Sequence, residues 1–167
     1  LVGATVVSLS SIQIERALHD FELDVGVTYH DSEPLTGVRT LPLYRERYVL
    51  LTPAAGPLGG ATEATWHEAA RLPLCLLTPD MQNRRIVDSL FTRAGVTVSA
   101  GIETNSVSTL FAHVRDGGWS SVMAHAWLHL FDVPRDLVAL PLARPAAAPS
   151  MGLVWLDRDP EGLLTRA

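Results

Sequence analysis

Three short polar segments follow strand-like apolar runs at the points where helical patterns begin. They are Ser10 with Ser11, Thr78 with Gln82 and Asn83, and Thr104 with Asn105 and Ser106. Backbone N–H groups at a helix start lack intrahelical partners and, together with hydroxyl and amide side chains, they bind carboxylates and other anions. Because α/β folds bind ligands at the carboxyl ends of their strands, these segments predict a ligand site. The alternative is that each residue only caps its helix, since Ser, Thr and Asn are preferred there.

Three basic residues lie close to these segments. Arg84 and Arg85 stand in the first turn of the helix after Thr78 and favour an anionic ligand. The alternative for both is a solvated helix face, since arginines are mostly exposed. His30 follows a strand directly and is a candidate contact, because binding residues are often carried on loops. We therefore expect a small, anionic metabolite as the ligand.

No metal site or catalytic machinery is predicted. His125 and His129 stand at i and i+4 in HAWLH, a spacing found in zinc sites, but no Glu follows His125 and no third ligand is near. The sequence contains no GxSxG, GxGxxG or GxxxxGK[ST] motif, and it offers no nucleophile beside a base. We therefore expect a binding protein that has no cofactor and is not an enzyme.

Composition restricts the class of protein further. Of the 167 residues, 47% are hydrophobic, which suits a globular core, and 13 basic against 18 acidic residues do not favour nucleic-acid binding by this chain alone. Cys75 is the single cysteine, so no disulfide can form within the chain and a reducing cytoplasm fits best. No apolar run approaches the roughly 20 residues of a membrane helix, and residues 1–9 are too short for a secretory signal.

Short β-branched runs alternate with helical patterns along the chain. Strands are predicted at 4–9, 24–29, 47–52, 74–77, 99–103, 121–123 and 151–156, and helices at 10–21, 66–71, 81–94 and 106–116. Capping-box spacing marks the starts of the first two helices. This alternation is typical of βαβ units around a largely parallel sheet.

Two Pro-rich segments, 53–60 and 144–150, divide the pattern. They predict two α/β lobes joined by two crossover segments. Residues 1–53 and 150–167 would form lobe I, and residues 54–149 would form lobe II. The candidate ligand residues would then face a cleft between the lobes.

Four segments in sequence order resemble one known family. IERALHDFELDVGVTY, LPLYRERYVLLTPAAGPL, PLCLLTPDMQNRRIVDSLFTRAGV and IETNSVSTLFAHVRDGGWSSVMAHAWL are similar to the effector-binding domain of LysR-type transcriptional regulators. The resemblance covers nearly the whole chain, although no single motif in it is diagnostic. It implies two Rossmann-like lobes of the type 2 periplasmic-binding-protein kind, with the effector between them.

The resemblance also carries expectations about the site and the partners. It places six residues at the cleft: Ser10, Tyr29, Thr78, Gln82, Asn83 and Thr104. It implies a homodimer or homotetramer in the full-length protein, and DNA binding only through a winged helix-turn-helix that would precede Leu1. From the family pattern we expect the sequence to be truncated at both ends, without the first strand and helix of lobe I.

The resulting hypothesis is a co-inducer-binding regulatory domain that controls transcription allosterically in the cytoplasm. The alternative is a solute-binding protein of a transport system, which would share the two-lobe architecture but would be exported. A small hydrolase or transferase would need converging catalytic groups, which the sequence does not offer.

Overall fold

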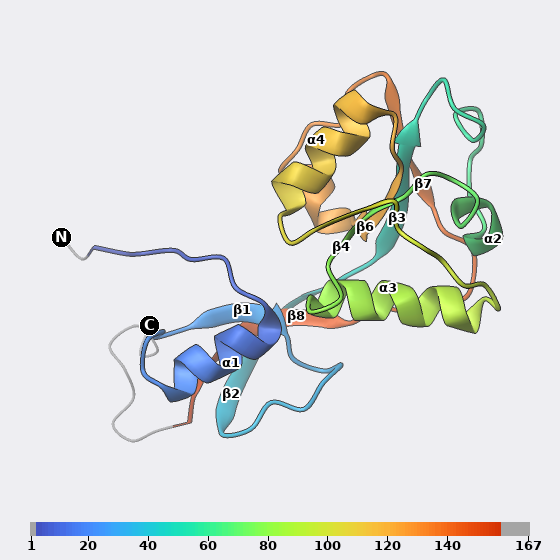
Figure 1. Ribbon diagram of the computed structural model, residues 1–167. Coiled ribbons are helices and arrows are strands. Elements are labelled where there is room, and N and C mark those ends of the chain that lie inside the picture. The colour runs from blue at the N-terminus through green and yellow to red at the C-terminus, as the bar shows by residue number, and fades with distance from the viewer. Residues whose placement is uncertain (1–2, 158–167) are drawn as a thin grey trace. The chain divides into compact units, whose positions relative to one another are not determined.

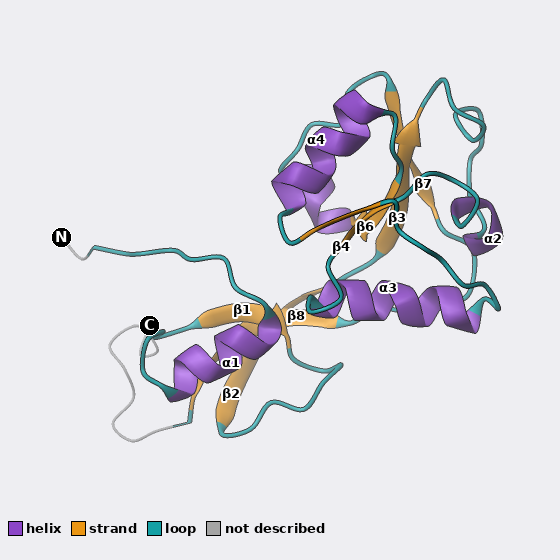
Figure 2. Cartoon of the chain, viewed as in Figure 1, coloured by secondary structure: helices purple, strands orange, loops and turns teal. Residues whose placement is uncertain are grey.

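The computed structural model describes residues 3–157 and divides the chain into two compact units (Figures 1 and 2). Unit 1 consists of Leu1–Arg45 and Pro149–Ala167, and unit 2 of Glu46–Ala148. The chain therefore passes between the units twice, at a first link between Arg45 and Glu46 and at a second link between Ala148 and Pro149. Each unit has its own strands and helices.

Unit 1 is an antiparallel sheet with one helix against it (Figure 2). Its strand order is β1-β8-β2, with β1 at Gly26–Tyr29, β2 at Val38–Arg45 and β8 at Ser150–Leu156. Helix α1, Ser11–His19, buries Ala17 and Leu18. The helix approaches so closely that a Cβ atom at Gly26 would collide with the side chain of Ile14. Glycine is therefore required in β1 at this point.

The other face of the unit 1 sheet is largely exposed. Val27 of β1 and Leu41 of β2 both align with Leu153 of β8, the central strand. Val27 is 51% exposed and Leu41 is 50% exposed. Within residues 3–157, α1 is the one helix of this unit, and it lies on the opposite face.

Unit 2 has a mixed sheet arrangement. Antiparallel strands run in the order β6-β3-β7, with β3 at Tyr48–Pro53, β6 at Ser121–Ala124 and β7 at Leu137–Pro141. A parallel pair, β4 at Cys75–Leu77 and β5 at Ile102–Thr104, joins the edge through a bridge between Leu74 and Ser120. The helices are α2 at Trp66–Ala69, α3 at Gln82–Arg93 and α4 at Val107–Gly117, followed by the 3-10 helix η1 at His125–His129.

Helices cover both faces of the unit 2 strands. Successive residues of β3 point to opposite sides: Leu50 packs with Trp66 of α2 and Phe91 of α3, whereas Leu51 packs with the α4 side chains. The same alternation divides Leu76 from Leu77 in β4. These strands are accordingly continuous apolar runs, as expected for strands that are buried on both faces.

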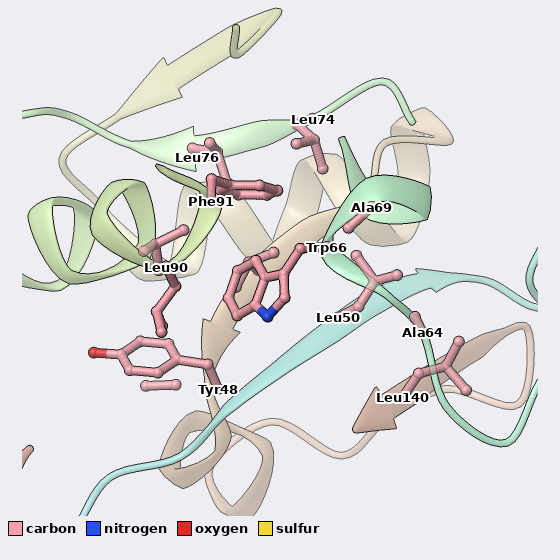
Figure 3. Packing of buried hydrophobic residues seen from close by; sticks show 13 residues of the cluster. Tyr48, Leu50, Ala64, Trp66, Ala69, Leu74, Leu76, Leu90, Phe91 and Leu140 are labelled. Carbon is pink, nitrogen blue, oxygen red and sulfur yellow. The ribbon is translucent and has the colours of Figure 1, made fainter. Parts of the chain in front are cut away.

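Trp66 is central to the larger of the two apolar clusters. Figure 3 shows its indole ring amid the other labelled side chains. The ring packs edge to face against the ring of Phe91, with 4.9 Å between the ring centroids. Its Nε1–H donates to the carbonyl oxygens of Ala143 and Pro145 at 2.9 and 2.8 Å. A buried tryptophan thus satisfies its polar atom while it fixes the segment that leads to the second link.

Helix ends follow the sequence signals closely. Ser10 with Gln13 and Thr65 with Glu68 form the predicted capping boxes of α1 and α2. Gly95 adopts a left-handed φ of 76° after α3. For α4 the left-handed residue is Gly118, with a φ of 69°.

Four expectations from the sequence are corrected. Residues 4–9 form no strand, because within residues 3–157 no strand pairs with them. Strands β2 and β7 were not predicted. Most pairings are antiparallel; β4 with β5 is the one parallel pair among the named strands of the described residues. Residues 46–53 lie in unit 2 rather than with residues 1–45, because β3 pairs with β6 and β7.

Candidate functional site

Thr78 and Thr104 lie side by side at the carboxyl ends of β4 and β5. The strands are parallel with Leu77 opposite Thr104, and Thr78 N donates to the Thr104 carbonyl oxygen at 3.0 Å. Two of the three polar segments therefore lie next to each other within unit 2. Helix α3 begins four residues after Thr78, so its first turn lies next to this edge.

The start of α3 differs from that of the other α-helices in the described chain. Helices α1, α2 and α4 are capped by the side chains of Ser10, Thr65 and Ser106. The N-cap residue of α3 is Met81, which makes no side-chain capping bond. The partial positive charge of the α3 N-terminus is therefore not met by a cap side chain.

Two shielded polar atoms beside this helix start have no hydrogen-bond partner. They are Thr78 Oγ1 and Gln82 Nε2, and Gln82 is only 3% exposed. A buried polar group without a partner costs roughly 1–3 kcal/mol, so most such groups in proteins are paired. Both atoms can donate a hydrogen bond, and a ligand rich in acceptor oxygens would satisfy them.

In the third predicted segment, Thr104 to Ser106, the hydroxyl groups are used mainly in local hydrogen bonds. Thr104 Oγ1 accepts from Ser106 N at 3.2 Å, and Ser106 Oγ accepts from Thr109 N at 3.3 Å as the cap of α4. Asn105 is exposed, and Asn83 in the first turn of α3 is partly buried. Capping therefore accounts for Ser106, and Thr104 supports the same turn.

Arg84 is a structural residue and not a free cation. Its Nη1 donates to the Leu77 carbonyl oxygen at 2.6 Å and to Glu103 at 2.7 Å, and its Nε donates to Asp88 at 2.8 Å. Burial alone would lower the pKa of the guanidinium group, but the hydrogen bonds that it donates to Asp88 and Glu103 raise the pKa above its ordinary value. The residue stays charged and ties α3 to β4 and β5.

Arg85 also makes local contacts. Its Nη1 donates to the backbone carbonyl oxygen of Asp80 at 2.7 Å. The suggestion that these two arginines form a solvated face is wrong for Arg84, which is 8% exposed. Arg85 is partly exposed and carries a positive charge in the first turn of α3.

Unit 1 holds the remaining predicted residues. Ser10 caps α1 and is buried, while Ser11 Oγ accepts from Thr28 Oγ1 of β1 at 2.8 Å. Tyr29, the last residue of β1, is 7% exposed. His30 Nε2 lies 2.9 Å from Ser150 Oγ. The candidate residues thus form two groups, one in each unit.

Sequence reasoning missed two residues next to the links. Glu46 is 2% exposed although it is charged, and its Oε1 lies 2.5 Å from His125 Nδ1. Ser150 is held on all its polar atoms by His30 and Asp31. No local pattern marks either residue, because their partners lie 79 and about 120 positions away in the sequence.

Two further features are absent from the part of the chain that the structure describes. Within it, no group of three or more His, Cys, Asp or Glu residues is placed to hold a metal ion. Nor does any helix there have the length and apolar character needed to cross a bilayer.

Comparison with known proteins identifies the family. The model of the LysR substrate binding domain matches residues 2–167, so the chain belongs to this family. The HTH-type transcriptional regulator SsuR of Burkholderia cenocepacia is 26% identical over 130 residues, which are 77% of this chain and 41% of the relative. A probable nitrogen assimilation transcriptional activator of Synechococcus elongatus is 26% identical over 154 residues, or 89% of this chain and 49% of the relative.

The fold agrees with this assignment. The effector binding domain of QuiR in complex with shikimate superposes with a TM-score of 0.77 at 18% identity, covering 94% of this chain and 73% of that one. The architecture is therefore the mixed α/β fold of LysR effector-binding domains, of the type 2 periplasmic-binding-protein kind. The chain spans less than half the length of the two curated relatives, 41% and 49%.

Proposed function

We propose that this chain is the effector-binding part of a LysR-type transcriptional regulator and that its effector is a small anion held at the start of α3. The observation that carries the proposal is the pair of unpartnered donors, Thr78 Oγ1 and Gln82 Nε2, beside a helix start that no side chain caps. A carboxylate or an inorganic oxyanion would accept from both donors and would also meet the partial charge of the helix. Asn83, in the same turn, is the third proposed contact.

Five further residues stay predicted contacts. Ser10, Ser11 and Tyr29 come from unit 1, and Thr104 and Asn105 come from unit 2. His30 also stays a prediction, but with Nε2 already bonded to Ser150 its ring has less to offer a ligand. The QuiR domain was solved with shikimate, a small carboxylate, which supports the proposed ligand class by relationship only.

The regulator hypothesis is favoured over a transport protein by the relatives. Both curated relatives are named as transcriptional regulators, and neither is named as a transporter or an enzyme. We therefore propose that the full-length protein acts in the cytoplasm as a homodimer or homotetramer. In this proposal DNA is bound by a separate winged helix-turn-helix, and this domain transmits effector binding to it.

A thermal-shift screen of this chain against small carboxylates and inorganic anions tests the proposal. A ligand at 100 times its Kd stabilises the folded state by about 2.7 kcal/mol. For a protein of this size that is a rise in Tm of roughly 5–10 °C. We expect a hit among the anions, and we expect Thr78→Val and Gln82→Met to abolish its effect.

Thr52→Val serves as the matched control, because Thr52 is a buried threonine of unit 2 outside the predicted contacts, and its hydroxyl is already bonded to Ser120 Oγ at 2.7 Å. It is expected to lower the Tm of the free protein and to leave most of the ligand-induced rise. A hit that stabilises the Thr78→Val and Gln82→Met variants as much as the parent would place the ligand elsewhere. Failure of every anion to raise the Tm would contradict the proposed ligand class.

A further inference from the structure

The two links between the units are each held by a small polar cluster at the residue next to the unit boundary. Ser150 follows the second link by one position, and Glu46 directly follows the first. We define the unit 1 clasp as His30, Asp31 and Ser150, and the unit 2 clasp as Glu46, Arg47, His125 and Ala126. Neither set forms part of the proposed effector contacts, apart from the predicted residue His30.

The unit 1 clasp engages every polar group of Ser150. The Ser150 carbonyl oxygen accepts from His30 N at 3.2 Å, and its Oγ lies 2.9 Å from His30 Nε2. Its backbone N–H donates to Asp31 Oδ1 at 2.8 Å. Ser150 is 7% exposed, so these bonds are sheltered from competing water. The chain is therefore fixed to the end of β1 as soon as it has entered unit 1.

Asp31 also faces the first link. Its Oδ2 lies 3.9 Å from Nη1 of Arg45, the last residue of unit 1 before the chain leaves. The Arg45 side chain is 72% exposed, so this ion pair contributes little energy by itself. The position matters more than the strength, because one carboxylate contacts residues at both links.

The unit 2 clasp buries a carboxylate. Glu46 Oε1 lies 2.5 Å from His125 Nδ1 and accepts from the backbone N–H groups of Arg47 at 3.1 Å and Ala126 at 3.4 Å. His125 N donates in turn to the Arg47 carbonyl oxygen at 2.8 Å. A glutamate that is 2% exposed needs such partners, since an unpaired buried charge is strongly destabilising. The chain is thus fixed to the start of η1 immediately after the first link.

We propose that these clasps are positioning devices that confine any movement between the units to the backbone bonds at Arg45–Glu46 and around Pro149. Hinges are formed by a few residues that absorb the change in φ and ψ between rigid elements. Because Glu46 and Ser150 are held fast, only the residues between the clasps can act in this way, and Pro149 has a fixed φ of its own. This inference rests on the proposed function for its purpose, since effector binding would be read out through such movement.

Double electron–electron resonance between spin labels on the two units tests the proposal without an effector. Labels are placed at Glu22→Cys in unit 1 and Glu63→Cys in unit 2, both exposed positions; Cys75 is fully buried and should stay unlabelled. Asp31→Ala removes the acceptor for Ser150 N and should at least double the width of the distance distribution. Asp31→Asn retains an acceptor oxygen and should keep the parent width.

Matched controls separate the clasps from general destabilisation. Asp157→Ala removes an equally exposed ion pair of unit 1, that with Arg39, which lies at the other end of β8 and β2, away from the links. Its distribution should keep the parent width. Glu46→Ala removes the shared acceptor of the other clasp and should broaden the distribution, whereas Glu103→Ala, which removes an acceptor of Arg84 within unit 2, should not.

The proposal is overturned if both Asp31→Ala and Glu46→Ala keep the parent width while circular dichroism shows that they are folded. It is also overturned if Asp31→Asn broadens the distribution as much as Asp31→Ala, since the ion pair would then matter and the Ser150 bond would not. Should Asp31→Ala fail to fold, the width measured for Glu46→Ala decides the question. None of these readings depends on an effector, so a failed anion screen would leave the hinge result intact.

Discussion

Replacing Thr78 by valine should stabilise the free protein while it abolishes effector binding. Valine has nearly the shape of threonine, so packing at the end of β4 is retained. The substitution removes Oγ1, a shielded atom that has no hydrogen-bond partner. Burying such an atom without a partner costs roughly 1–3 kcal/mol of folding free energy. Its removal is therefore expected to raise the free energy of unfolding by about 1 kcal/mol. In Tm this is a rise of about 2–4 °C.

The same substitution at Thr104 should have the opposite effect on stability. Thr104 Oγ1 accepts from Ser106 N at 3.2 Å, and its removal leaves that amide without this acceptor. A loss of about 1 kcal/mol is expected. Urea unfolding of the parent and both variants, followed by circular dichroism, measures the two changes side by side. If Thr78→Val proves destabilising by 1 kcal/mol or more, the hydroxyl has a structural partner and the reasoning from unpaired donors is refuted.

Three further substitutions test structural contacts within the two units. Arg84→Met should destabilise unit 2 by about 2–3 kcal/mol, because the Leu77 carbonyl oxygen and two carboxylates lose a charged donor. Urea unfolding measures this loss, and an unchanged urea midpoint would show that the guanidinium is dispensable. Gly26→Val should lower the free energy of unfolding by about 1–3 kcal/mol, because the new side chain collides with Ile14 and displaces α1. Urea unfolding followed by near-UV circular dichroism measures this loss, and a variant as stable as the parent would disprove the contact. Hydrogen bonds within its own capping box lower the pKa of Glu68, so its contribution to stability is complete above the ordinary pKa of a glutamate and is lost as the pH falls through the lowered value. Glu68→Gln should therefore flatten the fall in Tm on acidification, and an unaltered pH profile would count against the box.

Local signals predicted the helices well. The boundaries of α1 and α3 were expected within two residues, and both capping boxes are present because Ser and Thr caps act on amides only three positions away. Strands were harder to predict. Residues 4–9 have the β-branched pattern of a strand, yet a strand exists only through a partner, and within residues 3–157 none is placed beside them.

The candidate site was only partly predictable. The sequence identified Thr78 and Gln82 as candidates, since a polar residue at the end of an apolar run is visible locally. It could not show that Met81 leaves α3 uncapped or that Thr104 is already bonded to Ser106 N. Nor could it reveal Arg84 as a buried tie, since that role depends on Glu103, 19 residues away.

Nuclear magnetic resonance of the 15N-labelled chain during titration with the best anion from the thermal-shift screen tests the central claim most directly. The effector proposal predicts that the largest amide shifts fall on residues 78–84, at the end of β4 and the first turn of α3. It also predicts that these shifts disappear in Thr78→Val. Saturable shifts confined to other parts of the chain would contradict it.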